Sequence, residues 1–211
     1  MAAAPLTRSV AIFDLGGVLL DWNPRFLYRK LFNGDEPAME RFLATVCTTE
    51  WNERQDAGRS FAQAIEDLLP RHADKLELIE AFGKRFSEMI RGPIGGAVEV
   101  LAELRERDVP LYALSNWSAE TFAPQRQRFE FLSWFEGIVI SGLEGVIKPD
   151  PRIFRILLDR YGIAAETAVF IDDVARNAAA ASALGIQGIH FRTPEQLRLE
   201  LVTLGMLPAH D

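Results

Sequence analysis

The sequence predicts an α/β fold: a Rossmann-like, three-layer core with a five-stranded parallel sheet, carrying an inserted α-helical cap. Three observations predict it: short apolar runs with the length of strands, helical periodicity between them, and one long stretch with helical periodicity alone. Near-continuous apolar runs are typical of parallel strands that are covered on both faces. Strands that alternate with helices along a chain predict a parallel sheet between helical layers.

Five short runs rich in Val, Ile, Leu and Phe are the predicted strands. They are residues 10–15, 110–115, 137–141, 168–172 and 187–191. Helices are predicted between them, because apolar residues recur at three and four positions in residues 94–104 and 153–161. Residues 177–184 are rich in alanine, which lets a helix pack closely on a sheet, and Gly185 suits the end of that helix. Pro194 suits the first position of the last helix.

Residues 24–90 interrupt this alternation, because they show helical patterns and no convincing strand. Their apolar stripes are Phe42, Leu43 and Val46, then Phe61, Ile65, Leu68 and Leu69, then Leu76, Ile79, Phe82, Phe86 and Met89. Helices that share no sheet bury their stripes against one another, as in a bundle. We therefore expect a cap domain of residues 23–92 inserted into a core domain of residues 1–22 and 93–211.

The charge balance and the single cysteine limit the function classes. The 211 residues include 23 Lys and Arg against 30 Asp and Glu, a net charge of −7, which argues against nucleic-acid or anionic-membrane binding. No apolar run approaches the length of a transmembrane helix, and the first residues do not resemble a signal peptide. Cys47 has no partner for an internal disulfide, which suits a reducing compartment. We expect a cytoplasmic monomer or homodimer that acts on a small molecule.

Polar side chains follow four of the predicted strands. They are, in strand order, Asp14 with Gly16 and Gly17, Ser115 with Asn116, Lys148, and Asp172 with Asp173 and Asn177. In doubly wound sheets, ligands bind at the carboxyl ends of the strands, so we expect these side chains to meet at one edge. Each residue alone has a simpler interpretation as a turn, a helix cap or a solvated lysine. Asn177 is as well explained by helix packing as by a polar contact. The order of the whole set favours a site.

This set of residue types suits phosphoryl transfer. The carboxylate of Asp14 can act as a nucleophile and become an aspartyl phosphate. A phosphate beside three carboxylates needs a cation, and Mg²⁺ prefers carboxylate and carbonyl oxygens. Ser115, the backbone amides near Gly16 and Gly17, and the Lys148 ammonium would hold the equatorial phosphate oxygens. Two adjacent acids at a buried strand end, Asp172 and Asp173, also favour a bound cation.

The order of these motifs resembles the haloacid dehalogenase-like hydrolase superfamily, in its small helical cap type. The motifs are the segment from Phe13 to Leu19, then Ser115-Asn116, Lys148-Pro149, and Asp172-Asp173 with Asn177, and they extend over nearly the whole chain. The resemblance implies a Rossmann-like core and an Asp14 nucleophile. It implies Mg²⁺ held by Asp14, the Gly16 carbonyl and Asp173, with Asp172 bound directly or through water. The nearest branch is similar to bacterial sugar-phosphate phosphatases, including glucose-1-phosphate phosphatase.

Gly16 departs from the superfamily pattern, in which most phosphatases carry a second Asp two residues after the nucleophile. A glycine cannot move a proton, so another group must protonate the leaving group and activate water. Some phosphatases of the branch that this chain resembles also have glycine there. One hypothesis is a substrate with a good leaving group, such as a sugar 1-phosphate. Asp21 or a metal-ordered water are alternative replacements.

Three further residues are candidates for substrate contact. Trp117 follows the second motif, and packing explains it equally well. Trp51 and Arg54 precede Gly58 in the cap, where caps of this superfamily place a specificity loop; an exposed helix end is the other interpretation.

The resulting expectation is a Mg²⁺-dependent phosphatase with Asp14 and Lys148 as catalytic residues. One alternative is a 2-haloacid dehalogenase, which has no metal and usually carries Tyr where this chain has Gly16. The other is a non-catalytic binding protein of the same fold, which Gly16 favours and the intact acids and lysine oppose.

Overall fold

Five parallel strands form the central sheet of the computed structural model, which describes residues 8–209. Their order across the sheet is β5-β4-β1-β6-β7. Their bounds are β1 Val10–Phe13, β4 Leu111–Ser115, β5 Gly137–Ile140, β6 Ala168–Asp172 and β7 Gln187–His190. Each strand lies within one predicted run, so the predicted parallel sheet is confirmed. The predicted core also includes residues 1–7 and 210–211, which lie outside the described residues.

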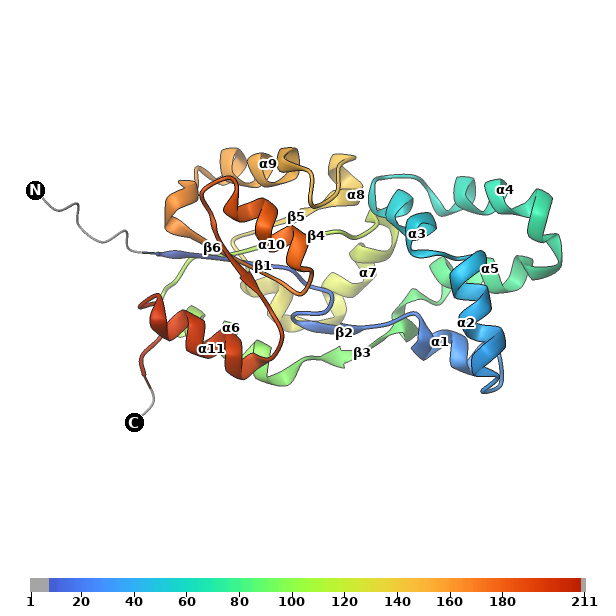
Figure 1. Ribbon diagram of the computed structural model, residues 1–211, viewed down its shortest axis with the longest axis horizontal. Helices are drawn as coiled ribbons and strands as arrows, with labels where there is room; N and C mark the ends of the chain where they lie inside the picture. The colour runs from blue at the N-terminus through green and yellow to red at the C-terminus, as the bar shows by residue number, and fades with distance from the viewer. Residues whose placement is uncertain (1–7, 210–211) are drawn as a thin grey trace, which may run out of the picture.

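Helices cover both faces of the sheet, which gives the predicted three layers (Figure 1). The helices of this core are α6 Gly95–Glu106, α7 Ala119–Arg128, α8 Ser141–Glu144, α9 Pro151–Tyr161, α10 Ala175–Ser182 and α11 Pro194–Thr203, with short 3₁₀ turns η3 Glu130–Trp134 and η4 Ala165–Thr167. Successive residues of β1 belong to different apolar clusters. Ile12 lies in the cluster that contains Phe154 of α9, whereas Phe13 lies in the cluster that contains Leu197 of α11. None of the helices in residues 8–209 is long and apolar enough to cross a membrane.

Helices alone occupy most of the stretch between the first two strands of the sheet. They are α1 Arg25–Leu31, α2 Glu36–Thr45, α3 Thr49–Asp56, α4 Phe61–His72 and α5 Leu76–Lys84, with 3₁₀ turns η1 Ala73–Lys75 and η2 Phe86–Met89. We call α1 to α5 the helical insert. Its centre is aromatic: the ring of Phe82 lies 5.2 Å from that of Trp51 and 6.2 Å from that of Tyr28. Leu76, which the periodicity places in a buried stripe, is the first residue of α5 and is exposed.

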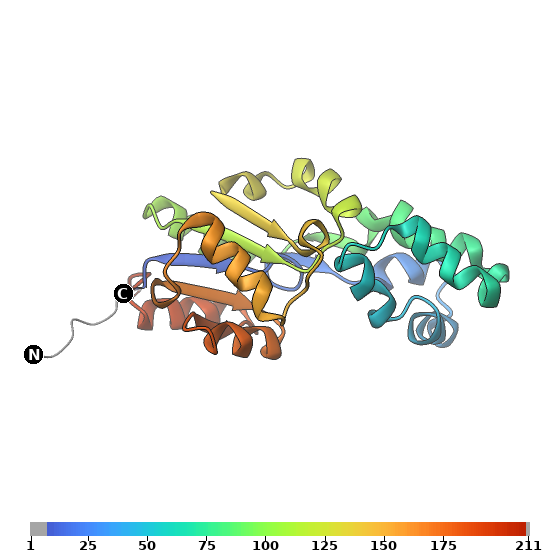
Figure 2. The ribbon, with the colours of Figure 1, turned by 90° about the horizontal axis from the view of Figure 1, so that it is seen from above.

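A two-stranded antiparallel ribbon connects the helical insert to the sheet. It is formed by β2 Leu20–Trp22 and β3 Ile90–Pro93, with Leu20 opposite Pro93 and Trp22 opposite Ile90. The sequence analysis did not predict this ribbon, because such short strands, one containing glycine and proline, show no alternating pattern. The ribbon carries the chain out of the core and back, and the helical insert lies beyond the carboxyl ends of the strands in both views (Figures 1 and 2).

Candidate active site

Asp14 lies directly after β1, at the carboxyl edge of the sheet, and its side chain is buried. Its Oδ1 accepts hydrogen bonds from the Leu15 backbone N–H and the Ser115 hydroxyl, both at 2.7 Å. Its Oδ2 lies 2.9 Å from Nζ of Lys148. Burial raises the pKa of Asp14 to about 7 even though the Lys148 ammonium opposes the shift. The hydrogen bonds and the ion pair therefore hold the carboxylate in place. Because the carboxylate is poorly hydrated, a further positive charge nearby would stabilise its ionised form.

Lys148 brings three strands of the sheet together through its ammonium group. The side chain is only 1 % exposed. Nζ donates to the Leu114 carbonyl at the end of β4 at 2.9 Å and to Asp172 Oδ2 at the end of β6 at 2.7 Å. Burial lowers the pKa of Lys148, but Asp14 and Asp172 outweigh that effect, so the pKa lies above its usual value. The group is a permanent cation at the centre of the site.

Asp172 and Asp173 follow one another at the end of β6 but differ in their surroundings. Asp172 is fully buried, and its oxygens also accept hydrogen bonds from the Val174 N–H at 2.8 Å and from Asn177 Nδ2 at 3.0 and 3.2 Å. Asp173 is exposed to the site opening. Partial burial, together with the charge of Asp172, raises its pKa. Asn177 therefore contacts the motif, which decides the open question about its role in favour of a polar contact.

A glycine is required at position 17 because the backbone there passes close to the Asp173 side chain. Its φ is +75°, and an added Cβ would lie 2.3 Å from Asp173 Oδ2. Its N–H donates to the Leu20 carbonyl at 2.9 Å, so the predicted contact of this amide with phosphate is not available here. At Gly16, in contrast, an added Cβ meets no atom within 4 Å. A Cβ at position 16 would therefore point into open space.

Asn116 positions Lys148 instead of pointing a free amide at a ligand. Its Nδ2 donates to the Lys148 carbonyl at 3.0 Å, and its Oδ1 accepts from the Lys148 N–H at 2.8 Å. Both ends of the side-chain amide are thus used by one backbone unit. The reciprocal pair forms because the loops after β4 and α8 meet at this point, and the second N–H of Asn116 Nδ2 leaves the predicted phosphate contact a prediction.

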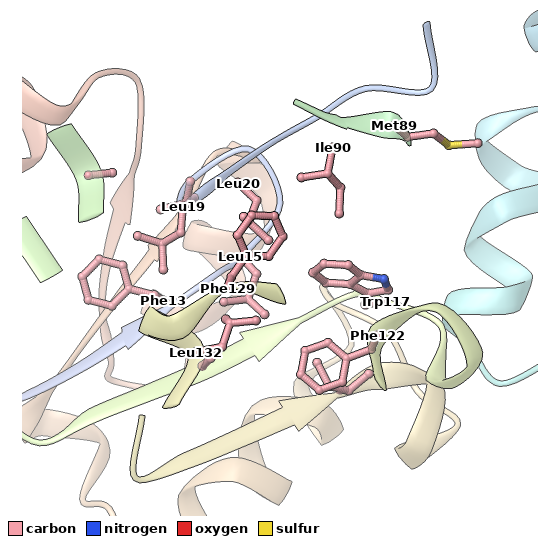
Figure 3. Packing of buried hydrophobic residues seen from close by; sticks show 14 of the residues in the cluster. Phe13, Leu15, Leu19, Leu20, Met89, Ile90, Trp117, Phe122, Phe129 and Leu132 are labelled. Carbon is pink, nitrogen blue, oxygen red and sulfur yellow. The ribbon is translucent and has the colours of Figure 1, made fainter. Parts of the chain in front are cut away.

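Trp117 packs in the core. Figure 3 shows it between Ile90 and Phe122, its indole N–H donates to Thr121 at 3.0 Å, and only 5 % of it is exposed. Trp51 likewise packs inside the helical insert, where its indole N–H donates to the Ala64 carbonyl at 3.2 Å. Neither tryptophan presents a polar group to the site, so we do not carry these two predicted contacts forward. Arg54 lies exposed on α3.

The acidic side chains form a suitable cradle for a divalent cation. Oxygen atoms of Asp14, Asp172 and Asp173 all lie within 4.8 Å of one another. Three carboxylates face the single ammonium of Lys148, and the set contains oxygen ligands only, which is the chemistry that Mg²⁺ prefers. Asn177 Oδ1 is buried beside them without a hydrogen-bond partner among the described residues. The residues present therefore fit a magnesium ion.

Two functional candidates were missed by the sequence analysis. Ser141 follows β5; its hydroxyl donates to the Asp56 carbonyl at 2.6 Å and accepts from the Trp117 N–H at 3.0 Å. Asp56 ends α3 and is buried, although it belongs to the polar segment before Gly58. The sequence signal that could have found Asp56 is an acidic residue at the end of a cap helix, two positions before a glycine. Its burial against the rim comes from contacts that the sequence does not show.

Comparison with known proteins decides the family. A family model described as haloacid dehalogenase-like hydrolase matches residues 9–185. The chain belongs to this family. The predicted superfamily is therefore confirmed, and so is the prediction of an enzyme: the matched family is one of hydrolases, and several of its curated relatives are phosphatases.

Three curated relatives of this haloacid dehalogenase-like chain are phosphatases. A sesquiterpene phosphatase of Aspergillus oryzae is 29% identical over 87% of this chain and 90% of its own length. A phosphorylated carbohydrates phosphatase of Thermotoga maritima is 27% identical over 85% of this chain and 82% of its own length. A phosphoserine phosphatase of Thermus thermophilus is 36% identical over 54% of this chain and 45% of its own length.

Solved structures of the same family share the fold. A haloacid dehalogenase-like enzyme of Bacteroides thetaiotaomicron, crystallised with magnesium, has a TM-score of 0.67 and 20% identity, covering 89% of this chain and 94% of that chain. A structure described as a dehalogenase has a TM-score of 0.60 and 19% identity, covering 84% of this chain and 81% of that chain. The fold thus accommodates both phosphatases and dehalogenases, and the choice between them depends on the site.

Proposed function

We propose that this protein is a Mg²⁺-dependent phosphatase that hydrolyses a small phosphorylated metabolite through an aspartyl-phosphate intermediate. One observation carries the proposal: the Asp14 carboxylate is fixed by Ser115 and Lys148 beside two further acids, within 4.8 Å of one another. A nucleophile, a phosphate-binding cation and a metal cradle thus coincide. The phosphatase relatives support the reaction class.

Each residue has a role in this proposal. Asp14 attacks phosphorus, and Ser115 and Lys148 hold phosphate oxygens and orient the carboxylate. Asp14, Asp173 and the Gly16 carbonyl hold the magnesium ion, with Asp172 acting through water because its oxygens already accept hydrogen bonds from Lys148, Val174 and Asn177. When bound, the ion supplies charge that neutralises the phosphate. Asn116 and Asn177 position Lys148 and Asp172.

The helical insert completes the proposal as a cap. We take residues 23–92 as the cap domain and residues 1–22 and 93–211 as the core domain, with the ribbon β2-β3 between them. Some contacts across the boundary are exposed ion pairs, such as Arg176 with Glu53 at 3.1 Å, and these can break and form as the cap moves. A closed cap excludes bulk water and selects the substrate. A cytoplasmic location and a monomeric or homodimeric state belong to the same proposal.

A sugar phosphate is our proposed substrate. The phosphorylated carbohydrates phosphatase of Thermotoga maritima, similar over most of the chain, supports this class. The names of the other relatives span a terpenoid and an amino acid, so the substrate is identified by a panel. Arg54, exposed on α3 in the helical insert, remains our candidate for a substrate contact from the cap.

The test measures phosphate release from sugar 1-phosphates, sugar 6-phosphates, phosphoserine and nitrophenyl phosphate. Activity should require Mg²⁺, disappear with a chelator, and fall at least about 10³-fold in Asp14→Asn, because the nucleophile is lost. Asp159→Asn, a substitution on the outer helix α9, is the matched control and should leave activity unchanged. Chloride release from 2-chloropropionate that resists the chelator would replace the proposal with a dehalogenase.

A further inference from the structure

Gly16 leaves the proposed phosphatase without the usual group for proton transfer. When an alkyl phosphate is cleaved, the leaving oxygen needs a proton, and the water that attacks next must lose one. Among the acids of the site, Asp14, Asp172 and Asp173 form the metal cradle. A separate carboxyl near the rim is therefore needed unless the substrate has a very good leaving group.

Asp21, the first alternative, is occupied elsewhere. It lies in β2 of the ribbon with a side chain 39% exposed, and its Oδ2 lies 3.4 Å from Arg91 Nη1 on β3. Asp21 is thus paired with the facing strand of the ribbon.

Asp56 is a buried carboxyl that the insert holds at the rim of the site. Its Oδ2 accepts a hydrogen bond from Asn52 Nδ2 at 2.9 Å, one turn earlier on α3. Its backbone carbonyl accepts a hydrogen bond from the Ser141 hydroxyl at 2.6 Å, and the Ser118 backbone acts electrostatically on its carboxyl group. These contacts join α3 to the loops after β4 and β5, beside Ser115. Asp56 is therefore fixed against the core although it belongs to the insert.

The surroundings of Asp56 favour its neutral form and place it in electrostatic reach of the reaction centre. Burial, together with the charge of Glu53 on the same helix, raises the pKa of Asp56 to about 7, while the Ser118 contact opposes the shift. The charges of Asp14 and Lys148 also act on it, with opposite signs. Such a carboxyl group can both give and take a proton near neutral pH.

A cavity in the helical insert lies one turn of α3 away from Asp56, whose side chain does not line it. It has a volume of about 330 Å³ and lies among α1, α2 and α3, and Asn52, the hydrogen-bond donor to Asp56, lines it. Trp22, Leu43 and Phe82 give it an apolar wall. The indole nitrogen of Trp22 is buried without a partner among the described residues and is available to a polar group. The organic part of a substrate in this cavity would lie beside Asn52, the hydrogen-bond partner of Asp56.

On the basis of the phosphatase function proposed above, we propose that Asp56 is the acid and base that replaces the aspartate absent at Gly16. In the first step Asp14 forms a bond to phosphorus, the bond to the leaving oxygen breaks, and that oxygen takes the proton of Asp56. In the second step water attacks the phosphorus of the aspartyl phosphate and gives its proton to Asp56. The carboxylate of Asp14 leaves, and inorganic phosphate is released.

The experiment compares two leaving groups in four proteins: wild type, Asp56→Asn, Asp56→Glu and the control Glu50→Gln, an exposed acid on the same helix. Asp56→Asn should lower kcat/KM about 10²–10⁴-fold for a sugar 6-phosphate, whose alkoxide is a poor leaving group. For nitrophenyl phosphate the loss should be less than about tenfold, because nitrophenolate leaves unprotonated. Asp56→Glu should recover part of the activity, and Glu50→Gln should change neither substrate.

The pH profile and a second-site variant give independent readouts. Relative to Asp56→Asn, in which Asp14 ionises over the same range, wild-type activity on the sugar 6-phosphate should fall as the pH rises through about 7, where Asp56 loses its proton. Adding Gly16→Asp to Asp56→Asn should restore activity, because the space at Gly16 is open. An equal loss on both substrates, no loss, or no recovery by Gly16→Asp would overturn the assignment of Asp56. Wild-type inactivity toward nitrophenyl phosphate would instead overturn the phosphatase proposal beneath it.

Discussion

Gly16 and Gly17 are adjacent in the chain, yet a methyl group would meet different surroundings at each. Gly17→Ala places Cβ within 2.3 Å of Asp173 Oδ2 and forces a side chain to accept a φ of +75°. We expect a loss of about 1–3 kcal/mol in the free energy of unfolding. The displacement of Asp173 should also raise the Mg²⁺ concentration needed for half-maximal activity.

Gly16→Ala is the matched control for Gly17→Ala. Its Cβ meets nothing within 4 Å, so stability should change by less than about 0.5 kcal/mol. Denaturant unfolding and a Mg²⁺ titration of phosphate release measure both effects. Equal behaviour of the two variants would show that the approach of Gly17 to Asp173 is not a constraint on the site.

At the scale of single residues, the sequence predicted the chemistry better than the contacts. The residue types of Asp14, Lys148 and Asp172 and their places after strands indicated one rim, and the structure brings them together there. The sequence did not indicate that Asn116 would bind the Lys148 backbone or that Trp117 would be buried. Such partners depend on where two loops far apart in the chain meet.

At the scale of elements, the loop after β4 and the loop after α8 form one unit through Asn116 and the backbone of Lys148. Asn116→Ala removes two hydrogen bonds and should cost about 1–3 kcal/mol of stability. Lys148 then loses its fixed position, so phosphate release should fall about 10²-fold although every proposed catalytic residue is still present.

Thr193→Ala is the control that separates the loss of stability from the loss of activity. The Thr193 hydroxyl accepts a hydrogen bond from the Gln196 N–H at the start of α11, on the outer layer of the core. Loss of this helix cap should cost about 1 kcal/mol without changing kcat. Thermal unfolding and steady-state kinetics on both variants make the comparison. Full activity of Asn116→Ala would mean that Lys148 is held by its ammonium contacts alone.

The elements were predictable where their own residues form a regular apolar pattern. The five strands of the sheet lie in near-continuous apolar runs between helices, so their pattern was visible. The ribbon strands Leu20–Trp22 and Ile90–Pro93 contain charged residues, glycine and proline instead of an apolar run, and they depend on pairing across the whole insert. Elements whose own residues form an apolar pattern can be predicted from the sequence. Elements that are stabilised only by pairing with a distant segment cannot.

At the scale of the whole molecule, one apolar cluster runs from the sheet through the ribbon into the helical insert. Its members include Phe13 of β1, Leu20 and Ile90 of the ribbon, and Phe42 and Phe82 of the insert. Figure 3 shows the part of this cluster between the sheet and the ribbon. Parts that share a buried core lose each other's packing when one of them unfolds. The cap and the core should therefore unfold together.

Calorimetry tests this coupling directly. We expect a single transition with a ratio of calorimetric to van 't Hoff enthalpy close to one. Phe82→Ala removes a buried ring that packs against Tyr28, Trp51 and Phe61, and should cost about 3–5 kcal/mol. The midpoint of the whole transition should then fall by roughly 6–20 °C without splitting. A separate low-temperature transition in Phe82→Ala would show that the insert unfolds on its own, and closure of the cap would then involve local unfolding instead of movement about the ribbon.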